Sequence, residues 1–257
     1  MTALVQTIVE REGAWWRLVL NAPRGNLLSL EMVRALDAAV STAEGERGVK
    51  WLTVEGRDGE FSFGARIQEH VPGLMATVLP ETHALFRRFL AFPAPTAALV
   101  EGRCLGGGFE LALACDDILA TDSAVFGLPE IRLAAFPPAA AALLPPRVGA
   151  SRATRAITTG QMQGAGYWHD AGLLSMVAPR ASLLDAAGAW FDVQLAPHSA
   201  VALAHAVQAA RLTLRAQAEP ALAAAEQDYL ERLMKTADAA EGVQAWTEKR
   251  APNWKDA

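Results

Sequence analysis

The sequence contains little cysteine and no pattern of metal ligands. Only two of its 257 residues are cysteines, Cys104 and Cys115, which cannot form a disulfide framework or a thiolate zinc site. Both lie in apolar surroundings, which indicates buried, reduced and unreactive thiols. Four histidines also lack any partner pattern, so no metal is expected to bind them: His83, His169, His198 and His205.

Long apolar segments are missing as well. The richest stretch, Leu133–Leu144, is interrupted by Pro137 and Pro138 and is too short to cross a bilayer. The first residues, Met1–Arg11, lack the basic region and apolar core of a secretory signal. These absences predict a soluble, cytoplasmic protein that does not associate with membranes.

An excess of basic charge is also absent. The formal net charge is −5, so no positive field is available to attract nucleic acid. An anionic ligand such as a coenzyme A ester is still compatible with this charge, but its basic contacts must be local. With 52% hydrophobic and 20% charged residues, the composition excludes a disordered or fibrous protein.

Strand and helix patterns alternate through the first two thirds of the chain, which favours an α/β fold of stacked short sheets. Apolar and turn patterns predict five strands, at Val5–Val9, Trp15–Leu20, Val49–Val54, Thr96–Val100 and Ile118–Thr121. Helices are expected between an N-cap at Ser29 and Gly45, over Glu81–Leu90, and over Gly106–Cys115.

Strand signals end after about Asp192. Three alanine-rich helical patterns follow, at Ser199–Gln217, Ala221–Met234 and Ala239–Lys249. We therefore expect a core of residues 1–192 that holds the active site and a C-terminal helical region of residues 193–257. This change of architecture need not mark an independent domain.

Three consecutive glycines, Gly106–Gly108, connect an expected strand to an expected helix. Glycines let a ligand approach the backbone, and the first helical N–H groups are unpaired at the positive end of the helix. The segment therefore suits a phosphate or a developing oxyanion, although a simple tight connection explains it equally well. A P-loop is disfavoured because no Lys-Ser/Thr pair follows, and a Rossmann fingerprint because the third glycine has the wrong spacing.

Two glutamates lie in apolar sequence near this segment. Glu110 follows the glycines on the expected helix, and Glu130 lies 20 positions later in the loop Phe126–Ile131. A carboxylate in such surroundings is either paired structurally or poised for proton transfer. A third segment of interest, Phe61–Ile67, follows a strand and a turn.

Together these segments resemble the crotonase (enoyl-CoA hydratase/isomerase) superfamily. The resemblance rests on Gly64-Ala65, on the Gly-Gly-Gly-x-Glu-Leu run that ends at Leu111, and on the Phe-Gly-x-Pro-Glu run that ends at Glu130. It continues through Gly160, Ala171–Leu173 and Glu241–Arg250, and so covers nearly the whole chain. It implies a crotonase (ClpP/crotonase-like) α/β fold of repeated ββα units, with a C-terminal helical oligomerisation region that forms a homotrimer or a homohexamer.

The resemblance also implies roles for four residues. The backbone N–H groups of Ala65 and Gly107 would form an oxyanion hole for an enolate-like species. Glu110 and Glu130 would hold the attacking water, one accepting its proton and the other delivering a proton to carbon. Because both glutamates are present, hydration is favoured over isomerisation. Which glutamate plays which part stays open, as does a purely structural role for one of them.

Further residues are expected to contact an acyl-CoA thioester, whose coenzyme A is part of the substrate, so no separate cofactor is expected. In the family the loop after the second strand binds coenzyme A, which makes Arg24 a candidate neighbour of its phosphates or adenine. Lys255 would reach the nucleotide of an adjacent subunit. The full expected set is Arg24, Asn26, Phe63, Gly64, Arg66, Ile67, Gly106, Leu128, Pro138 and Lys255.

Arg66 departs from the family pattern, in which many hydratases have an aspartate, and puts straight-chain specificity in question. The stretches Phe61–Ala65, Glu69–Pro72 and Phe136–Pro138 resemble the cyclohexa-1,5-diene-1-carbonyl-CoA hydratases of anaerobic benzoyl-CoA degradation. This resemblance implies hydration of that thioester to 6-hydroxycyclohex-1-ene-1-carbonyl-CoA. Paired prolines would make a rigid pocket wall suited to a compact ring.

Other interpretations remain open at this point. The chain could be a general enoyl-CoA hydratase or isomerase, a ring-opening hydrolase of the same fold, or a non-catalytic acyl-CoA-binding protein. The presence of both glutamates argues against the last. The Arg66 side chain is expected in solvent rather than on the coenzyme A phosphates, and a packing role is expected for His70 rather than a catalytic one.

Overall fold

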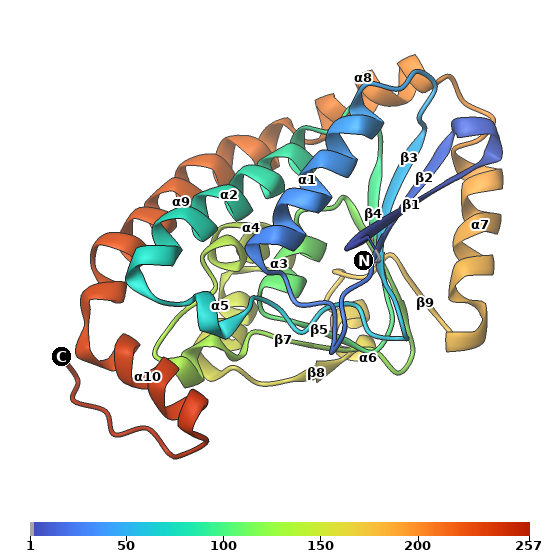
Figure 1. The fold of residues 1–257 in the computed structure, drawn as a ribbon. Helices are drawn as coiled ribbons and strands as arrows, with labels where there is room; N and C mark the ends of the chain where they lie inside the picture. Colours follow the sequence, from blue (N-terminus) through green and yellow to red (C-terminus); the bar gives the residue numbers. More distant parts are fainter. Residues whose placement is uncertain (1–2) are drawn as a thin grey trace.

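Two β-sheets form the frame of residues 3–257, which is the part of the chain that the computed structural model describes (Figure 1). The larger sheet has six strands in the order β1-β2-β3-β4-β6-β9, and the smaller has three in the order β5-β7-β8. Pairing is parallel except between β1 and β2 and between β7 and β8. The strands are β1 (Val5–Glu10), β2 (Trp15–Leu20), β3 (Trp51–Gly56), β4 (Thr96–Val100), β5 (Arg103–Leu105), β6 (Asp117–Thr121), β7 (Val125–Gly127), β8 (Gln163–Gly164) and β9 (Met176–Ala178).

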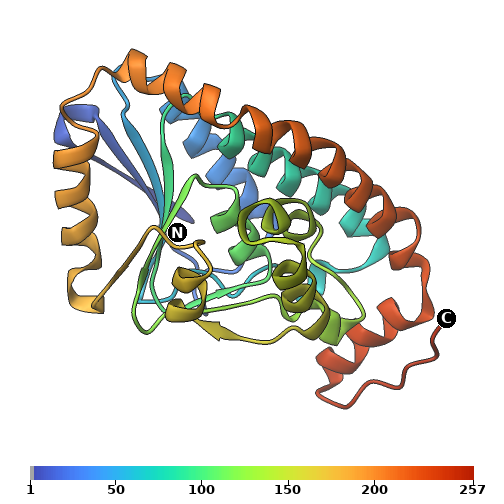
Figure 2. The same ribbon diagram turned by 180° about the vertical axis from the view of Figure 1, so that it is seen from behind.

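Helices cover both sides of this frame, so the structure has the expected α/β architecture. Helices α1, α2 and α9 lie together on one side, and α7 lies on the other side of the larger sheet (Figures 1 and 2). The α-helices are α1 (Leu30–Glu44), α2 (Pro72–Ala91), α3 (Gly107–Leu113), α4 (Pro138–Val148), α5 (Ala150–Thr159), α6 (Ala165–Asp170), α7 (Leu183–Gln194), α8 (Ala200–Ala210), α9 (Leu212–Glu231) and α10 (Ala237–Glu248).

The larger sheet separates two apolar clusters, one on each of its sides. On the α7 side, Trp15 and Trp51 pack with Phe191 of α7, whose ring centroid lies 5.7 Å from that of Trp15 and 5.9 Å from that of Trp51. The main core fills the opposite side, between the sheet and α1 to α4. A third, smaller cluster joins α2 to α9 through residues such as Met75, Leu79 and Tyr229. This third cluster forms one wall of the candidate site.

Most expected elements of the first two thirds are present, with local differences in their bounds. Ser29 caps α1 by accepting a hydrogen bond from the Met32 amide, as expected. Helix α2 begins nine residues earlier than the sequence pattern indicated, at Pro72 instead of Glu81. Proline is suited to the first helical position, where its missing N–H costs nothing, and the helix continues through Pro80. The early turns of α2 therefore lie over the candidate site.

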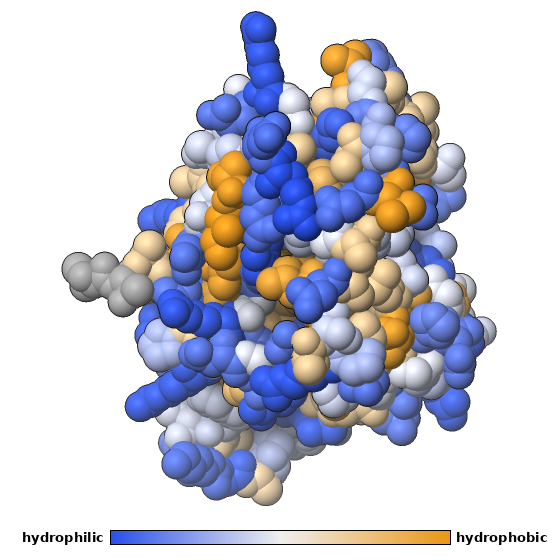
Figure 3. All heavy atoms as spheres, turned by 90° about the vertical axis from the view of Figure 1, so that its right-hand side faces the viewer, coloured by the Kyte–Doolittle hydropathy of each residue, from blue (hydrophilic) through white to orange (hydrophobic). Residues whose placement is uncertain are grey.

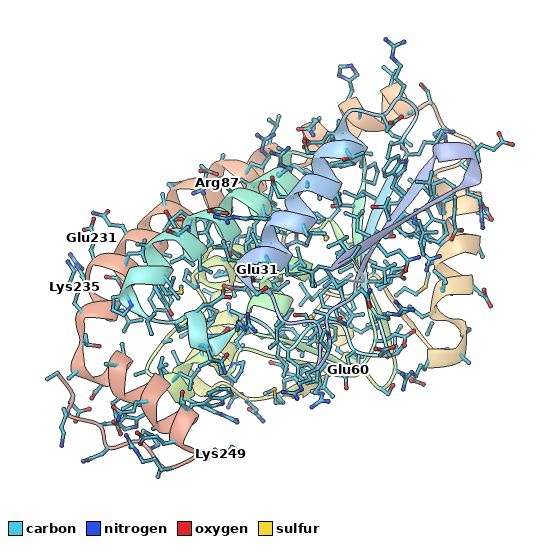
Figure 4. All side chains as sticks on the ribbon, viewed as in Figure 1. Glu31, Glu60, Arg87, Glu231, Lys235 and Lys249 are labelled. Carbon is cyan, nitrogen blue, oxygen red and sulfur yellow. The ribbon has the colours of Figure 1, made fainter. Side chains whose placement is uncertain are left out.

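The C-terminal helices also differ from the expected pattern. The break predicted between Gln217 and Ala221 does not occur, because Pro220 lies inside α9. The break is instead at Arg211, between α8 and α9. Helix α9 packs against both α2 and α4, and its Glu219 binds Arg87 of α2, labelled in Figure 4. These tertiary contacts stabilise the helix across the proline. The division of the chain near residue 192 stays a prediction.

Arg211 connects the C-terminal helices to the sheet and offers a stability test. Its guanidinium is buried, donates to Asp116 and to the carbonyl oxygens of Phe92 and Ala94, and lies 2.7 Å from Asp116 at its closest Nε–O contact. Arg211→Gln should lower the free energy of unfolding by about 3 kcal/mol, since removing one partner of a buried ion pair leaves the other uncompensated. Urea denaturation measures this. Arg215→Gln, on the exposed side of the next turn, is the control, and equal stabilities of the two variants would contradict the assignment.

The face of the molecule that carries α7 is mostly polar. Hydrophilic side chains dominate the face that carries α7 and surround separate apolar patches (Figure 3). Among residues 3–257 we find no helix with the length and apolarity that a bilayer crossing requires. The predicted absence of a signal sequence concerns Met1–Arg11, of which the first two residues lie outside the described part.

Candidate active site

The glycine run begins where β5 meets α3, and its first residue requires glycine. Gly106 has φ 51° and ψ −127°, a conformation that side chains other than hydrogen rarely allow. A Cβ on Gly106 would lie 2.5 Å from Oε1 of Glu130. The backbone at the start of α3 therefore passes directly against the second glutamate, which brings two of the three sequence motifs together.

The segment around Gly64 lies against the same helix start. Gly64 has φ 92°, and a Cβ there would be 2.7 Å from the Leu105 carbonyl oxygen and 3.2 Å from the Gly107 nitrogen. The Ser62 hydroxyl holds this segment: it donates to the Asn26 carbonyl and accepts from the Gly64 amide. The third motif is thus fixed beside the other two.

Two backbone amides are left without acceptors at this junction. The Ala65 nitrogen is 3.4 Å from the point where a Cβ on Gly107 would be, so the two residues face each other closely. Within residues 3–257 neither the Ala65 nor the Gly107 N–H group donates a hydrogen bond. Adjacent unpaired amides, one of them at a helix N-terminus, form a position suited to an oxyanion.

Glu110 projects from α3 and is held by the N-terminus of α4. Its Oε1 accepts hydrogen bonds of 2.7 Å from the Ala139 amide and 2.9 Å from the Ala140 amide. The preceding residues, Pro137 and Pro138, have no N–H to offer, so these are the first two donors of the helix. Burial raises the pKa of Glu110 above its usual range, and the two amide hydrogen bonds partly offset this by lowering it.

Glu130 lies in the first turn of the short 3-10 helix Pro129–Leu133 and is less well satisfied. Its Oε2 is buried without a hydrogen-bond partner in the described chain. Burial raises the pKa of Glu130, and the negative charge of Glu110 raises it further. At neutral pH this asymmetry favours an ionised Glu110, supported by a helix N-terminus, beside a protonated Glu130.

Both glutamates and both amides open into one cavity of about 50 Å³. This volume admits a few water molecules, each of which requires roughly 10–15 Å³ on such a measure. The lining residues are Leu28, Ala65, His70, Met75, Val78, Leu79, Thr82, Gly107, Glu110, Glu130, Phe136, Pro137, Pro138 and Tyr229. The two glutamates and the two amides therefore share one mostly apolar space, as is usual in a small-molecule binding site.

Several lining residues were not found from the sequence. Met75, Val78 and Leu79 come from the early turns of α2, and Tyr229 comes from α9. A proline followed by apolar residues at helical spacing was a usable signal for the start of α2. No local signal marks Tyr229, since α9 packs against α2 only in the folded chain.

His70 also lines the cavity, next to the oxyanion segment. Its Nδ1 lies 3.2 Å from the Arg66 carbonyl oxygen, which can only accept, so Nδ1 carries the hydrogen in this contact. Burial lowers the pKa of His70, which favours the neutral ring with Nε2 as an acceptor. The predicted packing role of His70 is not decided by this placement.

Four other expected binding residues do not line this cavity, and they differ in their exposure. Arg24 and Arg66 are exposed, and the Arg66 guanidinium is 3.8 Å from Glu69. Lys255 is exposed beside α10, where its amide donates to Asp238. Asn26 is buried and uses its side chain to hold the loop: it accepts from the Ala22 amide and donates to the carbonyls of Arg57 and Glu60.

The remaining expected residues are packed close to the glycine segments. Leu128 is buried in the main core, and Ile67 begins a short 3-10 helix, Ile67–Glu69. Phe63 lies under the Arg103 guanidinium, whose central carbon is 3.9 Å from the ring centroid. Arg103 in turn donates from its backbone amide and its guanidinium to Glu60, labelled in Figure 4. This ion pair fixes the strand that leads into Gly106.

Comparison with known proteins gives consistent matches along the chain. A family model described as enoyl-CoA hydratase/isomerase matches residues 10–257. The cyclohexa-1,5-dienecarbonyl-CoA hydratase of Thauera aromatica is 38% identical over 250 residues, covering 96% of this chain and 95% of that protein. The 2,3-dehydroadipyl-CoA hydratase of Escherichia coli is 34% identical over 260 residues, covering 97% of this chain and 98% of that protein.

Solved structures agree with these sequence matches. A crystal structure of an enoyl-CoA hydratase from Mycobacterium avium subsp. paratuberculosis superposes with a TM-score of 0.87, at 28% identity and full coverage of both chains. An enoyl-CoA hydratase/isomerase from Xanthobacter autotrophicus also gives 0.87, at 28% identity over 96% of this chain and 94% of that one.

Proposed function

The chain belongs to the enoyl-CoA hydratase/isomerase family, and from this premise we propose that it hydrates a cyclic, conjugated dienoyl-CoA thioester. It is a hydro-lyase of that family, and its proposed reaction converts cyclohexa-1,5-diene-1-carbonyl-CoA to 6-hydroxycyclohex-1-ene-1-carbonyl-CoA. The observation that carries this proposal is the pair of buried glutamates that share one cavity with two unpaired amides.

The geometry supports a division of labour between the two glutamates. We assign the ionised Glu110, held by two amides of α4, as the base that accepts a proton from water. The resulting oxygen bonds to carbon, and Glu130 delivers its proton to another carbon of the substrate. Negative charge that moves onto the thioester oxygen meanwhile is stabilised by the N–H groups of Ala65 and Gly107. The pair ends with the proton on Glu110 instead of Glu130, so solvent must restore it before the next turnover.

Two observations support a ring as the acyl group. The hydratase from Thauera aromatica, 38% identical over 250 residues, is named for a cyclic dienoyl thioester. The cavity is closed on one side by Phe136, Pro137 and Pro138, and prolines cannot adjust their backbone to a long flexible chain as other residues can. In this proposal the reaction is a step of anaerobic benzoyl-CoA degradation.

The proposal extends to binding and assembly. Arg24 and Lys255, both exposed, would contact phosphates or the nucleotide of coenzyme A, which belongs to the substrate and is not a separate cofactor. The helical region of residues 193–257 would form the contacts of a homotrimer or a homohexamer. Light scattering of the purified protein measures the number of subunits directly.

Parallel assays test the substrate. We expect the purified protein to hydrate cyclohexa-1,5-diene-1-carbonyl-CoA with a kcat/KM at least about tenfold above that for crotonyl-CoA, a difference of about 1.4 kcal/mol in transition-state binding. Mass spectrometry should find the mass of one added water with the ring intact. Efficient turnover of crotonyl-CoA alone would support the general enoyl-CoA hydratase instead, and an opened ring would indicate a hydrolase.

A further inference from the structure

Tyr229 brings a hydroxyl from the C-terminal helices into the cavity of the two glutamates. The residue is 2% exposed, and its ring packs edge-on against Phe136 with 5.4 Å between centroids. Its side chain lines the same cavity as Glu110 and Glu130. Within residues 3–257 its hydroxyl forms no hydrogen bond to the protein, and it is not among the fully enclosed unpaired atoms, so it is open to the cavity and free to bind a molecule there.

A second polar atom in this cavity lacks a partner as well. Oε2 of Glu130 is buried and accepts no hydrogen bond from the described chain. The pKa of Tyr229 is raised first by burial, then by Glu130 and then by Glu110, so its hydroxyl stays neutral and lies within the field of both carboxylates. Leaving the enclosed Glu130 oxygen unpaired costs free energy, and a water molecule between it and the Tyr229 hydroxyl would form hydrogen bonds with both. The cavity volume of about 50 Å³ is large enough to hold it.

We propose that Tyr229 is a positioning residue that holds the reacting water against the glutamate pair. Resting on the proposed function, this assigns the water a third partner: its two hydrogens point to Glu110 and to Glu130 Oε2, and its oxygen accepts a hydrogen bond from the Tyr229 hydroxyl. One lone pair of the water is then left for the substrate carbon. Tyr229 gives up no proton in the reaction. It acts by restricting the orientations of the nucleophile.

Tyr229→Phe removes only this hydroxyl and keeps the ring that packs on Phe136. We expect kcat for hydration to fall about tenfold, the effect of losing one hydrogen bond that orients the nucleophile. The dissociation constant of an unreactive saturated thioester, cyclohexanecarbonyl-CoA, should not change, because the hydroxyl holds water and not the acyl group. The limbs of the pH–rate profile should also keep their positions, whereas a displaced glutamate pair would move them.

The chain offers a matched control, because its only other tyrosine is Tyr167. Tyr167 packs against Trp168 and does not line the cavity. Tyr167→Phe should therefore leave kcat and analogue binding unchanged. Wild-type kcat in Tyr229→Phe, or a loss seen only in analogue binding, would overturn the proposed role.

A spectroscopic measurement tests the same contact without turnover. In the Tyr167→Phe protein, biosynthetic 3-fluorotyrosine labels Tyr229 alone. Its ¹⁹F resonance should shift with pH as the glutamate pair titrates, and this shift should disappear when Glu110 and Glu130 are both glutamine. A ¹⁹F chemical shift that does not change as the glutamate pair titrates would overturn the inference about Tyr229. Absence of any hydration by the wild-type enzyme would instead overturn the proposed function, so the two failures can be told apart.

Discussion

Glu130→Gln should lower kcat for hydration by about 10²–10⁴-fold, the range for losing a positioned general acid. Glu130 is the group that we assign to deliver a proton to carbon, and an amide cannot do so. Acyl-CoA binding should be nearly unchanged, because Glu130→Gln preserves the shape of the side chain. Glu110→Gln should cause a loss of the same order, since among residues 3–257 Glu110 and Glu130 are the only carboxylates that line the cavity and neither can replace the other.

Stability measurements can show that Glu130→Gln remains folded. Burial raises the pKa of Glu130, so the folded state binds this proton more tightly than the unfolded chain does. The stabilisation that comes from this bound proton is therefore fully present at pH values below the pKa of the unfolded chain. It is lost as the pH rises through the pKa of the folded state. Near neutral pH the uncharged glutamine should thus make the protein at least as stable as the wild type. Thermal unfolding at several pH values measures the difference.

An exposed glutamate supplies the control for these variants. Glu219 forms an ion pair with Arg87 on the surface between α9 and α2, and it does not line the cavity. Glu219→Gln should keep wild-type kcat, because it changes no catalytic group. Stability should also be nearly unchanged, since exposed ion pairs contribute little to the free energy of unfolding. Near-normal turnover in Glu130→Gln, with the protein folded, would refute the acid role assigned to Glu130.

Gly107→Ala should lower kcat/KM by about 10²–10³-fold with the fold intact, similar to the loss of one oxyanion donor. A methyl group at this position would lie 3.4 Å from the Ala65 nitrogen, in the space where the thioester oxygen has to meet both amides. Its other neighbours, Leu28 and Ala65 side-chain atoms, are 3.7 and 3.8 Å away, which are ordinary contacts. Alanine also favours helix, so the change removes access to the amides and leaves α3 undisturbed.

Gly166→Ala is the matched control for this substitution. Gly166 lies in α6, and a Cβ there meets nothing within 4 Å. Activity assays and circular dichroism of the two variants separate an effect on the oxyanion position from a general effect of alanine in a helix. If Gly107→Ala kept wild-type kcat/KM, the N–H groups of Ala65 and Gly107 would not be the oxyanion donors.

The sequence was sufficient to predict the parts of the protein that depend on local chemistry. The run from Gly106 to Glu110 contains a turn that requires glycine, a helix start with free amides and a carboxylate one turn later. The cap at Ser29 and the long strands are similarly local, since N-cap preference and apolar alternation act within a few residues. The family assignment follows from three such segments in the right order.

The tertiary structure decided what these segments do to one another. Only the folded chain brings the N-terminus of α4 to Glu110, leaves Glu130 Oε2 without a partner and adds Tyr229 from α9 to the cavity. The continuation of α9 through Pro220 likewise depends on packing against α2 and α4. The physical reason is that a pKa and a helix boundary depend on burial and on neighbours distant in sequence, which local patterns do not encode.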